Sequence, residues 1–335
     1  MTRTLALCLF TLALSAGAPQ MARAQQGTAS PVAVTAAPTS VADAIRHIEA
    51  SLGPTARIGV MARVEGERVL AATRAGEAFP MASTFKVAVA GAVLHRIERG
   101  DLSLDQVVAV TQAERDGDCY PDDAARLGPA PTIRVLLEEM MISSNNLAAD
   151  KLTAAVGGPR AVTRWLGEIG ISGQRIDHDV NGLFNRYVGY APATAPFRTA
   201  HGEAFCHSPW TQDPTWETSG EDSSTPEAMA ALIERLLDGQ VLNPEHRALL
   251  ETLMLACRTG EHRIRSLLPK HLRIAEKTGT LGGSINDVGV IALADGRRLV
   301  LAVFVAGVAD HQAAEAAIAS IAQAAWNAAA TRPAP

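Results

Sequence analysis

Patterns typical of β-strands lie at both ends of this chain of 335 residues, while its long middle is patterned as helices. Near the N-terminus, the apolar runs 58–64 and 69–73 surround a short glycine-containing turn and predict a β-hairpin. Near the C-terminus, the runs 287–293 and 299–308 surround a similar turn and predict a second hairpin. Both hairpins can join one sheet only if the helical middle is inserted between them.

The simplest fold is therefore an α/β fold, in the form of an α+β sandwich. We expect residues 41–84 and 256–335 to form one domain, in which helices flank an antiparallel sheet built from both termini. Residues 85–255 would form an inserted all-α domain, with a cleft at the junction. Within the insertion, residues 181–224 show little periodicity, and no helix is predicted there.

The first residues have the pattern of a secretory signal peptide. Arg3 precedes an apolar run at 5–18, and small residues lead to Ala24, after which we predict cleavage. Residues 25–40 follow as a flexible leader. The mature protein would be exported, periplasmic or secreted, and free of the membrane, although an uncleaved N-terminal anchor is the alternative.

Composition narrows the partners. A net charge of −5 and a pI near 6.0 leave no basic surplus for phosphates, so nucleic acid and anionic membranes are excluded in favour of a small molecule or peptide.

No Cys/His cluster has metal spacing, so we expect no metal and no other cofactor, and we expect a monomer. Of three mature cysteines, Cys119 and Cys206 form the favoured disulfide, and Cys257 is expected to be buried.

Three short motifs follow one another along the chain. In the first, Ser83 and Lys86 stand three apart at a helix start, so that a neutral Lys86 could activate Ser83 as a nucleophile. In the second, Ser144 could pass a proton to a leaving nitrogen and Asn146 could bind an amide carbonyl. Taken singly, the first motif is better explained as an exposed helix start, and the second could equally be a helix N-cap.

The third motif runs from Lys277 to Thr280 and enters a strand. Lys277 would lower the pKa of Lys86 by its charge, and with Thr278 it could hold a substrate carboxylate. Gly279 would let a ligand approach the backbone, while the Thr280 N–H would stabilise an oxyanion together with the helix start at Ser83. Taken alone, this stretch could be an ordinary glycine-rich strand entry. The ordered set of three is what predicts an acyl-transfer site.

In this combination the chain resembles the penicillin-recognising serine enzymes, and specifically the class A serine β-lactamases. Their motifs are Ser-x-x-Lys, Ser-x-Asn and Lys-Thr-Gly, and the likeness extends over nearly all of the mature chain, through 157–159, 224–230 and 259–265. The resemblance implies a β-lactamase/transpeptidase-like fold. It also implies that Arg263 reaches the substrate carboxylate and that Tyr120 lies at the edge of the cleft.

One part of the family pattern is missing. Class A enzymes hydrolyse the acyl-enzyme with a glutamate on the Ω loop, and a gapless count puts Val180 in its place. The extended Ω-type segment 178–222 is far longer than a compact Ω loop of about 6–16 residues, and His178 replaces the arginine expected to pair with Asp222. The replacement base is predicted to be Asp179, or else Glu217; the insertion also carries Glu203, Asp213 and Glu221.

Three functions remain in competition. The first is a β-lactamase that hydrolyses the lactam through a Ser83 acyl-enzyme, and we favour it because every acylation residue is present. The second is a D-alanyl-D-alanine carboxypeptidase or related penicillin-binding enzyme of peptidoglycan, which the absent glutamate favours. The third is a β-lactam-binding protein that is acylated without turnover. All three act on a β-lactam or a D-Ala-D-Ala-type peptide.

Overall fold

The computed structural model describes residues 40–66, 69–117, 121–187 and 214–331. In these ranges, no helix has both the length and the apolar character needed to cross a bilayer. The predictions for the signal peptide, for the disulfide and for several single residues fall outside them: Cys119, Tyr120, Glu203, Cys206 and Asp213.

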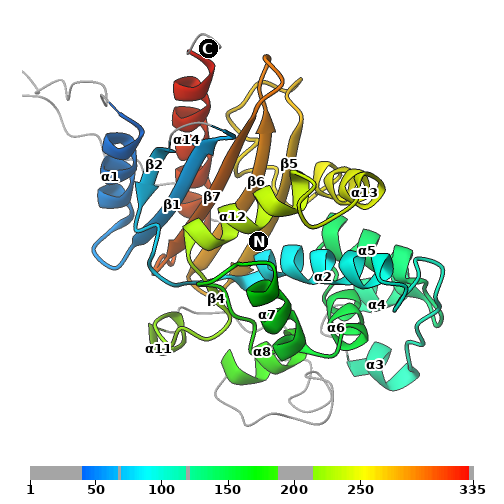
Figure 1. The fold of residues 1–335 in the computed structure, drawn as a ribbon. Coiled ribbons are helices and arrows are strands. Elements are labelled where there is room, and N and C mark those ends of the chain that lie inside the picture. The colour runs from blue at the N-terminus through cyan, green and yellow to red at the C-terminus, as the bar shows by residue number, and fades with distance from the viewer. Residues whose placement is uncertain (1–39, 67–68, 118–120, 188–213, 332–335) are drawn as a thin grey trace, which may run out of the picture. The chain divides into compact units, whose positions relative to one another are not determined.

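An antiparallel sheet of five strands joins the two parts of the chain (Figure 1). Its order is β2-β1-β7-β6-β5, and β1 pairs with β7, so that the N-terminal and C-terminal hairpins are continuous. This confirms the α/β fold with an antiparallel sheet drawn from both ends. The strands are β1 (Arg57–Val64), β2 (Val69–Thr73), β5 (Ile274–Leu281), β6 (Ser284–Ala292) and β7 (Arg298–Ala306).

Helices cover both faces of the sheet (Figure 1). On one face, α1 (Val41–Leu52) and α14 (His311–Ala330) bury apolar side chains against the sheet. Every second side chain of β1 and β7 points to this face. On the other face lie α12 (Pro226–Leu237) and α13 (Pro244–Leu255). These last two helices pack against the sheet, although the division predicted at residue 255 assigns them to the inserted domain.

Helix α2 (Lys86–Glu98) lies at the centre of the helical part, and its residues 86–94 are all buried. A helix that is apolar on every side is expected at the centre of such a group. A two-stranded sheet of β3 (Phe79–Pro80) and β4 (Ser223–Ser224) leads into it through the short 3₁₀ helix η1 (Ala82–Phe85). Helices α5 (Ile133–Ile142), α6 (Asn146–Ala155) and α7 (Pro159–Glu168) contact α2 directly. Helix α4 (Pro121–Leu127) packs on α5 and α6, and α3 (Gln112–Gly117) packs on α4.

The expectation of no helix after residue 181 is wrong at its start. Helix α8 (Val180–Tyr187) forms there, and a short α11 (Pro214–Glu217) precedes β4. Val180, Leu183 and Tyr187 are buried at helical spacing. Two carboxylates accept its first N–H groups: Asp150 bonds Val180 at 2.6 Å and Asn181 at 3.1 Å, and Asp179 bonds Gly182 at 2.7 Å.

Candidate active site

Ser83 lies on η1, where the chain turns from β3 into the buried helix α2. We call residues 80–85 the nucleophile turn. Two strands of the main sheet hold this turn. The Asn286 Nδ2 on β6 donates hydrogen bonds to the carbonyl oxygens of Pro80 at 2.8 Å and Met81 at 3.0 Å. On β5, a Cβ at Gly279 would stand 2.5 Å from the Met81 oxygen and 3.0 Å from the Ser83 nitrogen. Gly279 therefore admits the chain's own backbone, whereas we expected it to admit a ligand.

The two lysines meet at Ser144. The Lys86 Nζ donates to the Ser144 carbonyl oxygen at 2.6 Å, to its Oγ at 3.1 Å and to the Asn146 Oδ1 at 2.8 Å. The Lys277 Nζ donates to the same Ser144 Oγ at 3.0 Å and to the Thr278 carbonyl oxygen at 2.8 Å. The structure thus brings together all three motifs, which are far apart in the sequence.

The loop between α5 and α6 presents Ser144 in a left-handed backbone conformation, with φ of 62°. Such a conformation at a residue other than glycine costs on the order of 1–3 kcal/mol and is found where the surroundings impose it. Here Asn145 caps α6, since its Oδ1 accepts the Ala148 N–H at 2.8 Å. The N-cap suggested for this motif is therefore present, but it is made by Asn145, which leaves its two neighbours free for the site.

Both lysines are fully buried. The pKa of Lys277 is lowered to about 8, mainly by burial and also by the Arg263 guanidinium, while Cys257, Asp287 and Glu276 oppose this shift. A lysine with such a pKa can change its charge near neutral pH.

A cavity of about 300 Å³ opens on Ser83, Ser144 and Asn146 on one side and on Thr278, Thr280 and Arg263 on the other. Arg263 is rigidly held. Its Nη2 donates to the Thr280 Oγ1 at 2.6 Å, its Nη1 to the Gly279 and Asn286 carbonyl oxygens, and its Nε to Glu315 on α14. Hydroxyl and cationic groups at this end suit a carboxylate.

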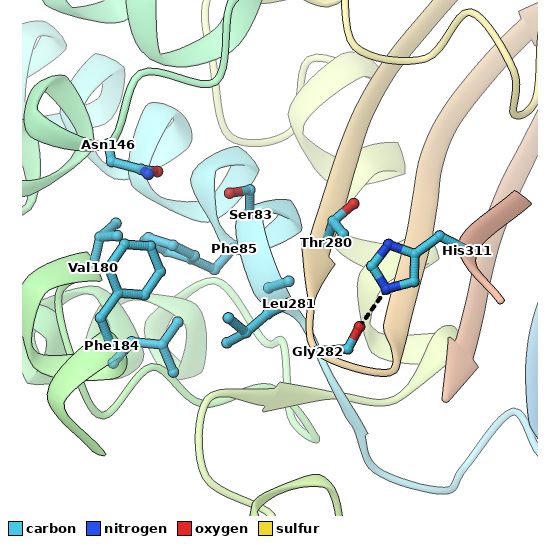
Figure 2. Close-up of a pocket in the computed structure, with 11 residues that line it drawn as sticks. Ser83, Phe85, Asn146, Val180, Phe184, Thr280, Leu281, Gly282 and His311 are labelled. Carbon is cyan, nitrogen blue, oxygen red and sulfur yellow. Dashed lines mark hydrogen bonds between the residues drawn. The ribbon is translucent and has the colours of Figure 1, made fainter. Parts of the chain in front are cut away.

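A second cavity of about 210 Å³ also opens on Ser83 (Figure 2). Val180, Leu183 and Phe184 on α8 form one wall, which is apolar. On the far side of Thr280, His311 bonds the Gly282 carbonyl oxygen through its Nε2 at 2.8 Å. Val180, which the gapless count puts in the place of the glutamate implied by the resemblance, thus lines the same cavity as Ser83.

The two predicted replacement bases lie elsewhere. The Asp179 carboxylate caps α8 through the Gly182 N–H, and Asp179 lines neither cavity that contains Ser83. Glu217 is buried on α11 and lines a separate cavity of about 130 Å³ with Arg57 and Glu221. The roles of Asp179 and Glu217 as bases stay predictions.

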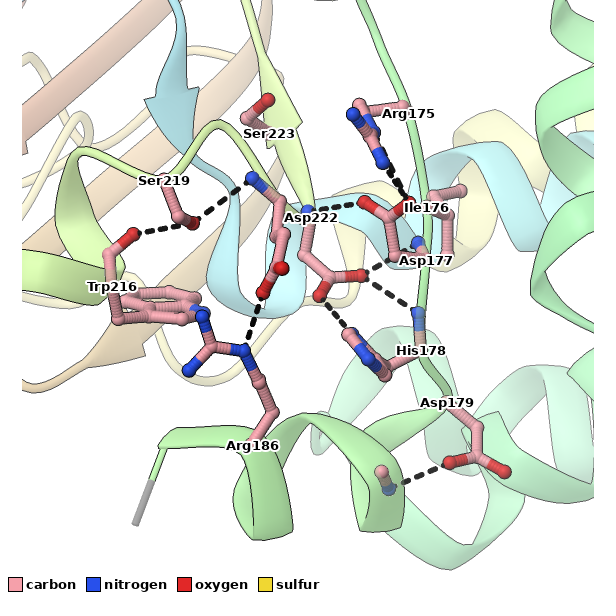
Figure 3. A network of polar contacts seen from close by, with 12 residues as sticks. Arg175, Ile176, Asp177, His178, Asp179, Arg186, Trp216, Ser219, Asp222 and Ser223 are labelled. Atoms are coloured by element: carbon pink, nitrogen blue, oxygen red, sulfur yellow. Dashed lines mark hydrogen bonds and ion pairs between the residues drawn. The ribbon is translucent and has the colours of Figure 1, made fainter. Parts of the chain in front are cut away.

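A clasp of His178, Asp177 and Asp222 joins the two ends of the segment 178–222 (Figure 3). The Asp222 Oδ1 accepts the N–H groups of Asp177 at 2.9 Å and His178 at 3.0 Å, and its Oδ2 lies 2.7 Å from the His178 Nδ1. The Asp222 N–H in turn donates to the Asp177 Oδ2 at 2.9 Å. The hydrogen bond to Asp222 raises the pKa of His178 above its ordinary value of 6.5.

Sequence reasoning missed Asn286, Asp150 and His311. Asn286 carried a signal, because an amide and a carboxyl interrupt a strand that is otherwise apolar and buried. Asp150 and His311 carried none, since their importance depends on which segment folds against them. Among the residues that the structure describes, no group of three or more His, Cys, Asp or Glu side chains is placed to bind a metal ion.

Known proteins share this architecture. The model of the beta-lactamase enzyme family matches residues 40–329. An ancestral class A beta-lactamase, the last common ancestor of Gram-negative bacteria, is 29% identical with a TM-score of 0.72, and the match covers 86% of this chain and 100% of that one. A second ancestral version is 30% identical, with coverages of 86% and 98% and a TM-score of 0.72. A putative class A beta-lactamase from Rhodopseudomonas palustris is 28% identical, with coverages of 86% and 99% and the same TM-score.

Proposed function

This chain belongs to the beta-lactamase enzyme family, in its class A, and from that membership we propose that it hydrolyses β-lactams through an ester formed at Ser83. The observation that carries the proposal is the meeting of Lys86 and Lys277 at the Ser144 hydroxyl, beside the cavity that contains Ser83. An acyl transfer needs a proton acceptor, a proton donor and an oxyanion site around one nucleophile.

In the acylation step, Lys86 in its neutral form takes the Ser83 proton as Ser83 Oγ attacks the lactam carbonyl. The backbone N–H groups of Ser83 and Thr280 receive the oxyanion, since Gly279 brings β5 against the nucleophile turn. The Ser144 Oγ accepts hydrogen bonds from the ammonium forms of both lysines, so its own proton is free for the leaving nitrogen. Reprotonation from a lysine restores Ser144.

The substrate is oriented by its two polar ends. Its carboxylate binds at Thr278, Thr280 and Arg263, which lie at one end of the larger cavity. Its amide carbonyl accepts a hydrogen bond from the Asn146 Nδ2. The Asn146 Oδ1 already accepts from Lys86, so the nitrogen points to the substrate side. These assignments favour an anionic cyclic amide as the substrate class.

A second candidate function is supported by the apolar wall. Val180, Leu183 and Phe184 offer no group that could activate water beside Ser83. A site of this kind would be acylated quickly and would deacylate slowly, as in a D-alanyl-D-alanine peptidase or a β-lactam-binding protein. The two candidates share the acylation step and differ only in the fate of the ester.

A time course of intact-protein mass spectra after mixing with benzylpenicillin tests both candidates. Hydrolysis predicts a transient adduct at Ser83 together with released product, and the second candidate predicts a persistent adduct. Ser83→Gly should abolish the adduct, whereas Ser103→Ala, at an exposed position, should leave it unchanged. A wild-type protein that forms no adduct, or one that survives in Ser83→Gly, would refute the proposed function.

A further inference from the structure

Two acidic side chains are buried together beneath Lys277: Glu276 on β5 and Asp287 on β6, which we call the acid pair. Neither side chain has any exposed surface. In the register of the two strands, Glu276 lies opposite Gly289, two residues from Asp287. The two side chains therefore share a face of the sheet as diagonal neighbours, a separation that long side chains can bridge.

In each member of the acid pair, one carboxyl oxygen accepts a hydrogen bond and the other has no partner. The Glu276 Oε1 accepts from the Arg265 Nε at 2.6 Å, and the Asp287 Oδ2 accepts from the Ile264 N–H at 3.1 Å. The Glu276 Oε2 and the Asp287 Oδ1 are buried without a hydrogen-bond partner. Two ionised carboxylates in this arrangement would repel each other and would also bear two desolvated oxygens.

The surrounding backbone fixes the Glu276 carboxyl where it is. A Cβ at Gly260 would come within 1.8 Å of the Glu276 Oε1, so the carboxyl occupies the space that this glycine leaves open. Directly across the strand pair, Gly289 has no side chain to separate Glu276 from Asp287. The ionisable groups whose charges act on the pair are Arg263 and Arg265 from the segment after α13, the Cys257 thiol, and Lys277, which points to the other face of the sheet.

We propose that Glu276 and Asp287 hold one proton between them, with a Glu276 Oε2–H donating to the Asp287 Oδ1, so that the acid pair carries a single negative charge beneath Lys277. One proton then satisfies both leftover oxygens and removes the repulsion. Burial, followed by the Asp287 charge, raises the pKa of Glu276 to about 10, and burial raises that of Asp287 to about 6. The proton is therefore assigned to Glu276, whose pKa is raised further.

The single charge gives the acid pair a positioning role toward the proposed reaction. Both members of the pair are among the groups that raise the pKa of Lys277 against the lowering by burial, and Asp287 raises it more than Glu276 does. The pair therefore maintains the ammonium form of Lys277 that donates to the Ser144 Oγ. This consequence rests on the proposed function, whereas the shared proton does not.

Infrared spectroscopy in D₂O tests the shared proton directly. Burial also raises the pKa of Asp150, so the informative signal is the difference between the spectra of the wild-type protein and Glu276→Gln, in which the Asp150 band cancels. At neutral pH this difference should contain the carbonyl stretch of a buried protonated carboxyl, because Glu276→Gln keeps the shape and a donor but lacks that carboxyl. The difference between the wild-type protein and Glu77→Gln, at a half-exposed ion pair with Arg57, should not contain it. Absence of the stretch from the Glu276→Gln difference spectrum would overturn the proposal even if Ser83 were never acylated.

The pH profile of the acylation rate constant tests the link to Lys277. Lys277, with its pKa of about 8, is expected to set the alkaline limb of the wild-type profile. Asp287→Asn removes the negative charge, so the pKa of Lys277 falls and this limb should move to lower pH. Glu276→Gln replaces a neutral group by a neutral group and should move that limb much less. Equal shifts in the two variants would contradict a proton held on Glu276.

Discussion

Position 279 shows how much of the site can depend on one missing side chain. Strand β5 approaches the nucleophile turn so closely that the nearest backbone atoms, the Met81 oxygen and the Ser83 nitrogen, lie 2.5 Å and 3.0 Å from where a Cβ would be. Neither atom belongs to a flexible side chain, so both strand and turn would have to move. The glycine of the third motif is thus a requirement for placing Ser83.

We therefore expect Gly279→Ala to lower the second-order rate constant for acylation by a penicillin about 100-fold, the order of loss that follows a displacement of reacting groups by about 1 Å. Stopped-flow or mass-spectrometric acylation kinetics would measure it. Gly76→Ala is the control, because nothing lies within 4 Å of its Cβ and its φ is ordinary. Acylation of Gly279→Ala at the wild-type rate would show that the contact does not position Ser83.

Substitutions at position 180 test whether a carboxylate at this place speeds the hydrolysis of the acyl-enzyme. Val180→Glu would put a carboxylate on the wall beside Ser83, at the first turn of α8, where a helix favours negative charge. A general base typically contributes about 10²–10⁴ in rate, so the adduct should decay faster by a factor in that range. Val180→Gln has the same size without basicity. Equal adduct lifetimes in the two variants would argue that water cannot reach the ester from this side.

The motif residues could be predicted because their chemistry is written in fixed spacings, and the structure brings Lys86, Ser144 and Lys277 into contact. The fold could be predicted from strand patterns and turns. A deacylation base could not be identified, because a carboxylate in the insertion reveals nothing about the cavity it faces. Asp179 illustrates this limit: its side chain caps a helix that periodicity alone did not reveal.

At the scale of elements, α8 depends on partners from elsewhere in the chain. Asp150 on α6 accepts its first two N–H groups, and the clasp of His178, Asp177 and Asp222 fixes the chain just before it. Asp222 itself adopts a left-handed backbone with φ of 43°. Such a helix is stabilised by tertiary contacts more than by its own sequence, which explains why it was not predicted.

The clasp should make local stability depend on pH. The pKa of His178 is raised by Asp222, so its stabilising contribution is complete below pH 6.5, the ordinary value, and is lost as pH rises through the elevated pKa. His178→Arg keeps the charge throughout. Between about pH 5 and about pH 8, the free energy of unfolding of the wild-type protein should fall relative to that of His178→Arg, as measured by urea titration.

The comparison isolates this residue because the other histidine–carboxylate contacts, such as that of His246 with Glu98, are present in both proteins. Limited proteolysis gives a second measurement, in which cleavage within α8 should accelerate with pH in the wild-type protein only. Parallel stability curves for the two proteins would mean that the His178 charge does not hold the ends of the segment together.

At the scale of the whole described fold, one apolar core lies on each face of the sheet, and the site lies on the side of one of them. One core contains α2 and the helices around it together with one sheet face, and the other lies beneath α1 and α14. The nucleophile turn belongs to the first core, yet its carbonyl oxygens are held by Asn286 on β6. Sheet and turn are therefore coupled, so catalysis should respond to a change in a strand that never touches the substrate.

Asn286→Ala tests this coupling. It removes the donors to the Pro80 and Met81 oxygens and the acceptor of the Val305 N–H, and each buried group left unsatisfied costs about 1–3 kcal/mol. Both the free energy of unfolding and the acylation rate constant of the folded protein should fall. Val290→Ala, a cavity variant in the same buried strand, should lower stability by an amount on the order of 1–3 kcal/mol while leaving that rate constant unchanged. If Asn286→Ala lost only stability, as Val290→Ala is expected to, the turn would be held in place by its own helix and not by the sheet.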